Sequence, residues 1–204
     1  MIGIINYGSG NVQAIANIYN RTNFLYKIIQ DPEQLKTVDK LILPGVGDFD
    51  ETIKVLDSSG LRYALNEEVL VKKKPVLGIC VGMQILSNDS EEGNQKGLGW
   101  IKGSVKKFNS KKIKEKPFIP HMGWNNVEPK ISHDLFRDID NELGFYFVHS
   151  YYFNSLNSNN ILATTFYGED FTSAVFNGNI FGVQFHPEKS HSNGIQLLSN
   201  FAKI

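Results

Sequence analysis

The stretch "KPVLGICVGMQIL" (residues 74–86) contains Cys80, the single cysteine of the 204-residue chain. The apolar run before Cys80 is typical of a buried strand, and the residues after it have the apolar spacing of a helix. Gly78 and Gly82 flank the cysteine in the Gly-x-nucleophile-x-Gly pattern of a nucleophile elbow, a sharp strand-to-helix turn. We therefore expect Cys80 to be a nucleophile at the carboxyl edge of a sheet. A buried packing role is the alternative.

The first half of the chain alternates strand-like and helix-like segments. Besides the run before Cys80, apolar runs that end in glycine lie at 2–8 and 40–47. Such runs are typical of strands that are buried on both faces of a parallel sheet. Helical spacing occurs at 11–23 with Asn11 as the predicted N-cap, at 49–57, at 61–72 and directly after Cys80. This alternation predicts an α/β fold with right-handed crossovers.

The second half has a different character. It contains short strand-like pieces rich in aromatic and β-branched residues, at 99–109, 119–129, 145–153, 161–168 and 171–186. "NGN" at 177–179 is typical of a hairpin turn, and a final helix is predicted over 192–204. We expect an additional antiparallel β portion here. Because no linker divides the chain, we expect one domain over residues 1–204.

The composition excludes several classes of protein. Lys plus Arg and Asp plus Glu both number 21, so a balanced charge gives no reason to expect nucleic acid or a membrane surface as a partner. One cysteine allows neither an internal disulfide nor a cysteine-based zinc cluster. The N-terminus does not have the pattern of a secretory signal, and no apolar run approaches the ~20 residues of a membrane span. We expect a cytoplasmic globular protein with no metal and no cofactor.

One strongly basic segment, 106–116, interrupts this balance. We interpret it as a solvated turn between two strands, with a docking surface as the alternative.

A base for Cys80 is predicted near the end of the chain. His186 ends the apolar run 180–185, and Pro187 halts the strand there, so His186 is expected at the same sheet edge as Cys80. Glu188 can reach the other imidazole nitrogen and fix its tautomer. A His-Pro-Glu sequence alone is more often a surface turn. Together with the glycine-framed cysteine it predicts a Cys80–His186–Glu188 triad for acyl transfer.

Two backbone N–H groups are candidates for an oxyanion hole. Val81 begins the helix after the cysteine, where free N–H groups favour a thiolate and can donate to an oxyanion. "PGVG" at 44–47 follows another strand, and its glycines allow the N–H of Val46 to approach a substrate. An ordinary strand-to-helix turn is the alternative for that segment.

Five motifs in order resemble the class I, triad-type glutamine amidotransferases: "LPGVGDF" (43–49), "GICVGMQIL" (78–86), "PHMGWN" (120–125), "YFVHSYY" (146–152) and "GVQFHPEKS" (182–190). Within that family, "NYGSGN" (6–11) and "PHMGWN" resemble the glutaminase subunits of imidazole glycerol phosphate synthases. The resemblance extends from Ile2 to the final helix. It implies a flavodoxin-like fold with a mostly parallel central sheet flanked by helices.

The resemblance also implies an activity and a partner. The reaction is hydrolysis of L-glutamine to glutamate and ammonia through a thioester on Cys80. The ammonia passes to a (β/α)₈-barrel synthase subunit, which makes imidazole glycerol phosphate and an aminoimidazole carboxamide ribotide in histidine biosynthesis. Carried over by position, the substrate-contact candidates are Gly47, Gln84, Ser150 and Tyr151. The candidates for the face toward the barrel subunit are Asn6, Tyr7, Asn11, Met122, Trp124 and Asn125.

Several departures from the family pattern keep other functions open. Val81 replaces the more usual leucine, "LGW" at 98–100 is less typical, and His191 stands where many relatives have another polar residue. A paralogous subunit that supplies ammonia to a nucleotide-sugar modification in surface-polysaccharide synthesis is the main alternative. A free-standing cysteine hydrolase is disfavoured by "GMQ" and "PHMGWN". A catalytically inactive docking module is disfavoured by the intact triad.

Overall fold

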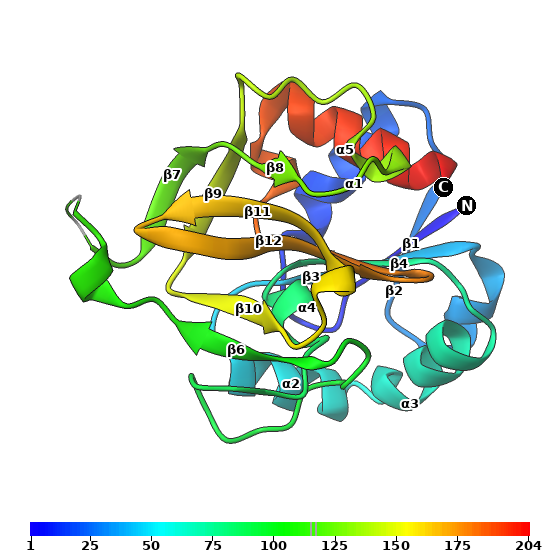
Figure 1. The fold of residues 1–204 in the computed structure, drawn as a ribbon. Helices are drawn as coiled ribbons and strands as arrows, with labels where there is room; N and C mark the ends of the chain where they lie inside the picture. Colours follow the sequence, from blue (N-terminus) through cyan, green and yellow to red (C-terminus); the bar gives the residue numbers. More distant parts are fainter. Residues whose placement is uncertain (115, 117) are drawn as a thin grey trace.

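The computed structural model describes residues 1–114, 116 and 118–204, and within them the strands form two sheets (Figure 1). The large sheet contains β1 (Ile2–Ile5), β2 (Tyr26–Ile29), β3 (Lys40–Gly45), β4 (Val76–Cys80), β5 (Asp89–Ser90), β6 (Gly103–Lys107), β8 (Glu128–Pro129), β10 (Tyr151–Ser155), β11 (Ile161–Tyr167), β12 (Glu169–Asn177) and β13 (Ile180–Val183). The small sheet pairs β7 (His121–Asn125) with β9 (Phe145–His149).

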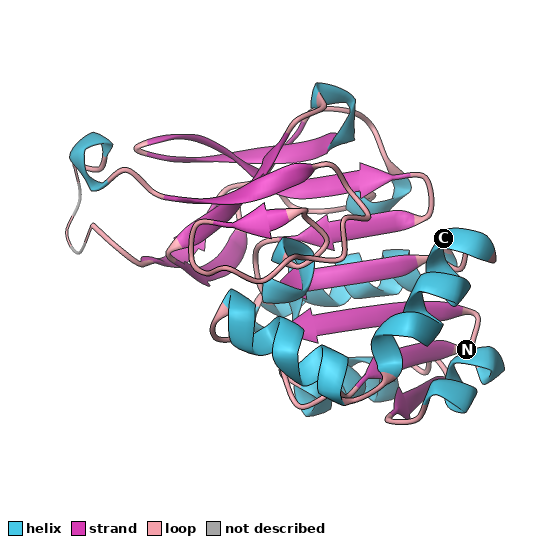
Figure 2. Ribbon diagram, turned by 90° about the horizontal axis from the view of Figure 1, so that it is seen from below, coloured by secondary structure: helices cyan, strands magenta, loops and turns pink. Residues whose placement is uncertain are grey.

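The N-terminal half is the predicted α/β layer structure. Its strands lie in the order β2-β1-β3-β4, and β13 from near the end of the chain adds beside β4; all of these neighbours are parallel. The longer helices are α1 (Val12–Arg21), α2 (Phe49–Ser58), α3 (Leu61–Asn66) and α5 (His191–Lys203). Figure 2 shows helices on both faces of these parallel strands. Every residue of β1 and β4 is buried, as the unbroken apolar runs require for strands covered on both sides.

The second half adds the antiparallel portion that its short aromatic segments predict. β13 pairs antiparallel with β12, β12 with β10 and β11, and β10 with β6. The turn between β12 and β13 contains Gly178 with φ +61°, the conformation that a tight hairpin needs. The small sheet places His121 directly opposite His149. The fold class predicted from the sequence is confirmed.

Aromatic rings hold the small sheet against the large one. Phe145 of β9 stacks on Phe185 with ring centroids 4.0 Å apart, and Phe147 meets Phe171 of β12 edge to face at 6.0 Å. All four rings are almost fully buried. Such pairs contribute about 0.5–1.5 kcal/mol each beyond the burial of their area. They fix β9, and therefore the segment after it, relative to the end of β13.

The turn at the end of β4 has the geometry of a nucleophile elbow. Cys80 has φ 56° and ψ −114°, a backbone conformation that L residues rarely adopt. A Cβ on Gly82 would lie 1.9 Å from the carbonyl oxygen of Leu43, and one on Gly78 would lie 2.5 Å from the carbonyl oxygen of Gly82. The two glycines therefore allow backbone contact between β3, β4 and the helix after Cys80.

The helix after Cys80 is shorter than its apolar spacing predicts. It spans only α4 (Val81–Gln84). The carbonyls of Ile85 and Leu86 accept hydrogen bonds from Leu98 and Ile101, so the chain leaves the helix to pair with the segment around "LGW". A second local expectation also fails, because Asn11 precedes α1 but makes no side-chain capping hydrogen bond.

Other segments complete the description. The predicted helix 61–72 continues from α3 into a π-helical turn, Glu67–Val71. In the basic segment, Lys106 pairs with Glu91 and Lys112 with Glu169, while position 115 lies outside the described residues. Among the helices described in the structure, none has the length and apolar character needed to cross a membrane.

The elbow predicts a strong stability effect at Gly82. Replacing Gly82 by Ala should lower the free energy of unfolding by about 3 kcal/mol, because the rigid backbone of β3 occupies the space of the new methyl group. Gly178→Asn is the matched control, since that site is open and asparagine tolerates positive φ, and it should cost less than about 1 kcal/mol. Denaturant unfolding measures both. Equal stability of the two variants would contradict the packing described here.

Candidate active site

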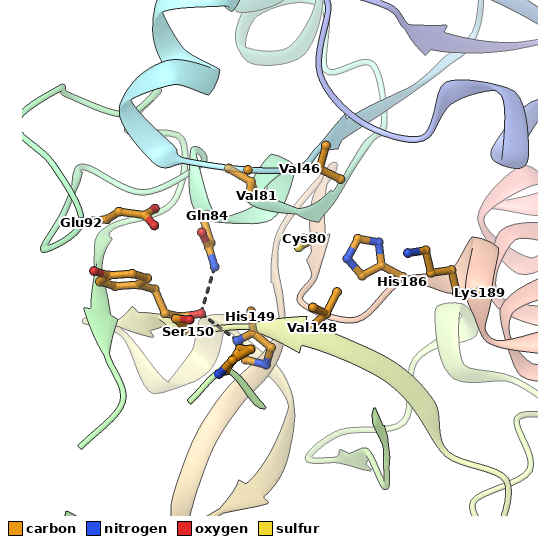
Figure 3. A pocket seen from close by; sticks show the side chains of 13 residues that line it. Val46, Cys80, Val81, Gln84, Glu92, Val148, His149, Ser150, His186 and Lys189 are labelled. Carbon is orange, nitrogen blue, oxygen red and sulfur yellow. Dashed lines mark hydrogen bonds between the residues drawn. The ribbon is translucent and has the colours of Figure 1, made fainter. Parts of the chain in front are cut away.

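A cavity of about 430 Å³ opens at the carboxyl edge of the parallel strands (Figure 3). Cys80 ends β4, Val46 and Gly47 follow β3, and His186 follows β13, so three neighbouring strands deliver these residues to one edge. The residues that line the cavity are Val46, Gly47, Cys80, Val81, Gln84, Glu92, Pro120, Val148, His149, Ser150, Tyr151, His186 and Lys189.

The structure brings Cys80, His186 and Glu188 together. His186 and Cys80 line the same cavity and interact electrostatically, and Nδ1 of His186 lies 2.8 Å from Oε1 of Glu188. The backbone of His186 is fixed because its N–H donates to Tyr146 of β9 and its carbonyl accepts from the Ser190 hydroxyl at 2.6 Å. All three side chains are almost fully buried. The imidazole is therefore oriented from both sides and cannot rotate freely.

The proton of His186 is held tightly. Burial by itself lowers the pKa of this imidazole, but its hydrogen bonds and charge interactions with Cys80 and Glu188 raise the pKa to about 10. The second carboxylate oxygen of Glu188 is buried and has no hydrogen-bond partner within the described part of the chain, so Glu188 directs its charge at His186. An imidazolium between a sulfur and a carboxylate favours a thiolate nucleophile and a proton ready for a leaving group.

The two predicted oxyanion donors differ in whether their N–H group is already used in a hydrogen bond to a side chain. Val81 is the first residue of α4 and lines the cavity beside Cys80, which suits its predicted role. The N–H of Val46 instead donates to Oγ of Ser9 at 3.0 Å, and the same hydroxyl lies 3.0 Å from the Val46 carbonyl oxygen. Donation from Val46 to an oxyanion therefore requires that this hydrogen bond be broken.

The four predicted substrate-contact residues all line the cavity. Gln84 uses its amide group internally, since Nε2 donates to the Tyr151 carbonyl at 2.9 Å and to Oε1 of Gln184 at 3.0 Å. Both amide hydrogens of Gln84 are thereby occupied. What its side chain can offer a substrate is the carbonyl oxygen, which accepts hydrogen bonds.

Gln184 and Glu92 are among the residues of the site that were not predicted from the sequence. Gln184 is fully buried, and its Nε2 lies 3.8 Å from Sγ of Cys80. In the sequence, Gln184 is a lone polar residue within an apolar run, two positions before His186. Side chains two positions apart in an extended segment point to the same side, so Gln184 could have been expected beside His186. Glu92 lines the opposite wall of the cavity, and burial together with the charges of Asp48 and Asp50 raises its pKa. Glu92 comes from a loop, and no local pattern marks it.

The residues predicted to face a partner do not all lie at the surface. Met122 and Trp124 are 59% and 47% exposed, Asn11 is exposed, and Asn6 and Asn125 are partly exposed. Tyr7 is buried instead, with its hydroxyl donating to the Pro44 carbonyl at 2.6 Å, so its side chain offers little surface to a partner, and its role at the interface stays a prediction. The apolar ring of Tyr7 packs inside, where it supports the segment before Val46.

A comparison with protein families adds to this geometry. The family model described as glutamine amidotransferase class-I matches residues 3–204. The chain belongs to this family. Full-length relatives are similar to it: a protein of Leptospira interrogans is 48% identical over 204 residues, covering 100% of both chains. A protein of Methanococcus maripaludis is 50% identical over 203 residues, covering 100% of this chain and 99% of its own. They are named imidazole glycerol phosphate synthase subunit HisH and subunit HisH 2.

Solved structures agree on the architecture. A crystal structure of a glutamine amidotransferase superposes with a TM-score of 0.72 at 19% identity, covering 100% of this chain and 99% of its own. At that identity the likeness supports the amidotransferase fold alone.

The hydrogen bonds of His186 predict its titration. In NMR spectra of histidine-labelled protein, His186 should stay protonated well above pH 7, with a pKa near 10, and Cys80→Ala should lower that pKa because one of its causes is removed. The folded-state pKa lies above the ordinary value of 6.5. The stabilising contribution of His186 is therefore complete below pH 6.5 and is lost as the pH rises through about 10. A wild-type His186 that titrates near pH 6.5 would contradict the described pairing.

Proposed function

We propose that this protein is the glutaminase subunit of an imidazole glycerol phosphate synthase, acting in the cytoplasm in histidine biosynthesis as one domain over residues 1–204. The observation that carries the proposal is Cys80 in a strained elbow, in one cavity with the Glu188-bound His186, in a chain whose full-length relatives carry that subunit's name. The overall reaction converts L-glutamine and water into glutamate and ammonia.

The first half of the reaction forms a thioester. The Cys80 thiolate attacks the side-chain amide carbon of glutamine, and the amide oxygen becomes negatively charged. The N–H of Val81 donates to that oxygen. The proton on His186 passes to the leaving nitrogen, the carbon–nitrogen bond breaks, and ammonia departs. Glu188 keeps the imidazole oriented throughout, because its carboxylate holds Nδ1 at 2.8 Å.

The second half regenerates the enzyme. His186, now neutral, takes a proton from a water molecule that attacks the thioester carbon. The bond to sulfur breaks, Cys80 leaves as a thiolate, and glutamate is released. The second oxyanion donor, Val46, becomes available when its hydrogen bond to Ser9 opens.

The cavity also offers groups for the amino-acid end of glutamine. The Glu92 carboxylate and the free oxygen of Gln84 are both acceptors on one side of the cavity, so we assign the α-ammonium group of the substrate to them. Gly47, Ser150 and Tyr151 complete the walls around the substrate. This orientation directs the side-chain amide of glutamine toward Cys80.

A partner surface lies beside the cavity. Val46, which lines the cavity, is 45% exposed, and Met122 and Trp124 are 59% and 47% exposed. Pro120 lines the active-site cavity, while Met122 and Trp124 follow it on β7. We propose that a (β/α)₈-barrel subunit docks here, with Asn6, Asn11 and Asn125 at the edge of the contact, and receives the ammonia.

The direct test is an assay of the protein in complex with its barrel subunit. Wild-type complex should form glutamate from glutamine and convert a phosphorylated ribulosyl aminoimidazole acceptor into imidazole glycerol phosphate. Cys80→Ala should reduce glutamate formation more than about a thousandfold, because the thioester cannot form. An ammonium salt should restore conversion of the acceptor, which is the control for an intact complex.

Other outcomes identify other functions. Retained glutaminase activity in Cys80→Ala would overturn the triad. Consumption of the ammonia by a nucleotide-sugar acceptor would indicate the surface-polysaccharide paralogue. Full turnover of glutamine by the isolated chain would indicate a free-standing hydrolase.

A further inference from the structure

A second polar group, besides His186, lies within hydrogen-bonding distance of the Cys80 sulfur. Gln184 is fully buried just after β13, and its Nε2 is 3.8 Å from Sγ. Its backbone N–H donates to Ser173 of β12 at 2.9 Å, which fixes the position of the side chain. The mechanism above does not use this residue.

The orientation of the Gln184 amide follows from its neighbours. The Tyr151 carbonyl can only accept, so the end of the Gln84 side chain that faces it must be the NH₂ group. That NH₂ group has a second hydrogen, which points to Gln184 at 3.0 Å. The atom of Gln184 at that contact is therefore its oxygen. Its own NH₂ group is left to face the sulfur.

The Tyr151 carbonyl is itself held in place by a series of hydrogen bonds through two histidines. His149 Nδ1 donates to this carbonyl at 2.7 Å, so Nε2 of His149 must accept from His121 Nδ1 at 2.9 Å. Nε2 of His121 then accepts from the Asn125 amide at 3.1 Å. Burial lowers the pKa of His149 to about 3 and that of His121 to about 4, so each ring has one donor and one acceptor at neutral pH. Every link of this series has one direction (Figure 3 shows its inner part).

The geometry points to Gln184 as a second hydrogen-bond donor to the Cys80 thiolate, with its amide held in the donating orientation by Gln84. A hydrogen bond to a charged acceptor is roughly twice as strong as a neutral one, so this donor favours the thiolate over the thiol. The inference rests on the proposed function, because it takes Cys80 as the nucleophile.

The effect of Gln184 on the Cys80 sulfur can be measured separately from the effects of the ionisable groups around it. The titratable side chains of the described residues that line the cavity around Cys80 are Glu92, His149, Tyr151, His186 and Lys189, and Tyr7 interacts electrostatically with Cys80 from outside the cavity lining. Glu188 acts on the sulfur through His186. Gln184 carries no charge, so its removal changes the behaviour of the sulfur without adding or removing a titrating group.

The test measures how the reactivity of Cys80 depends on pH. The full-length chain is treated with iodoacetamide over a range of pH, and the rate of Cys80 alkylation is followed by mass spectrometry. Gln184→Met keeps a similar volume but has no N–H donor. It should raise the pH of half-maximal alkylation by roughly one pH unit and lower kcat for glutamine about tenfold in the complex, with little change in KM.

A matched control separates this effect from lost packing. Gln196→Met removes an amide that donates to Asn200 at 2.9 Å on α5, and it should leave the alkylation profile unchanged. A folded Gln184→Met protein with the wild-type profile would overturn the inference. A wild-type protein that is not alkylated at Cys80 at any pH would count against the proposed function and the inference together.

A second measurement needs no substitution at Gln184. In NMR spectra of the wild-type protein, the side-chain amide protons of Gln184 should move downfield as compared with Cys80→Ala, because one of them points to a thiolate. Identical amide shifts in the two proteins would overturn the inference even if Gln184→Met does not fold.

Discussion

The backbone contact between the turn after Cys80 and the strand β3 is the constraint on which the site depends. Gly82 lies so close to Leu43 that no Cβ fits between them, and Gly78 is in similar contact with Gly82. This contact holds Cys80 in a positive-φ conformation that costs roughly 1–3 kcal/mol in isolation. The strained turn points the sulfur into the cavity between the ends of β3, β4 and β13. Packing of the parallel sheet thus determines where the nucleophile lies.

The fold and the triad were largely predictable from the sequence because their signals are local. Unbroken apolar runs indicate buried parallel strands, and the run at 40–47 and the run before Cys80 each end at residues of the site. The glycines around Cys80 and the proline after His186 mark the points where strands stop. Since parallel neighbours bring their carboxyl ends to one edge, two separate motifs could be assigned to one site.

The rest could not be predicted because it depends on contacts between distant segments. Glu92 reaches the cavity from a loop, where its carboxylate accepts a hydrogen bond from the N–H of Phe49, and the hydroxyl of Ser9 accepts from the N–H of Val46 across 37 positions of sequence. Helix α4 ends early because residues 98 and 101 take the carbonyls of 85 and 86. Tyr7 lies in a motif from which we predicted contacts with the partner, yet its ring is buried. Local pattern carries no information about such pairings.

The central claim is that the strained cysteine is the nucleophile for a glutamine side chain. Its most direct test is covalent labelling with a glutamine analogue that carries an electrophile in place of the side-chain amide, followed by peptide mass spectrometry. A single adduct is expected on the peptide that contains Cys80, formed more slowly in an excess of L-glutamine and absent in Cys80→Ala. Labelling of another residue, or no labelling of Cys80 in the complex with the barrel subunit, would contradict this claim.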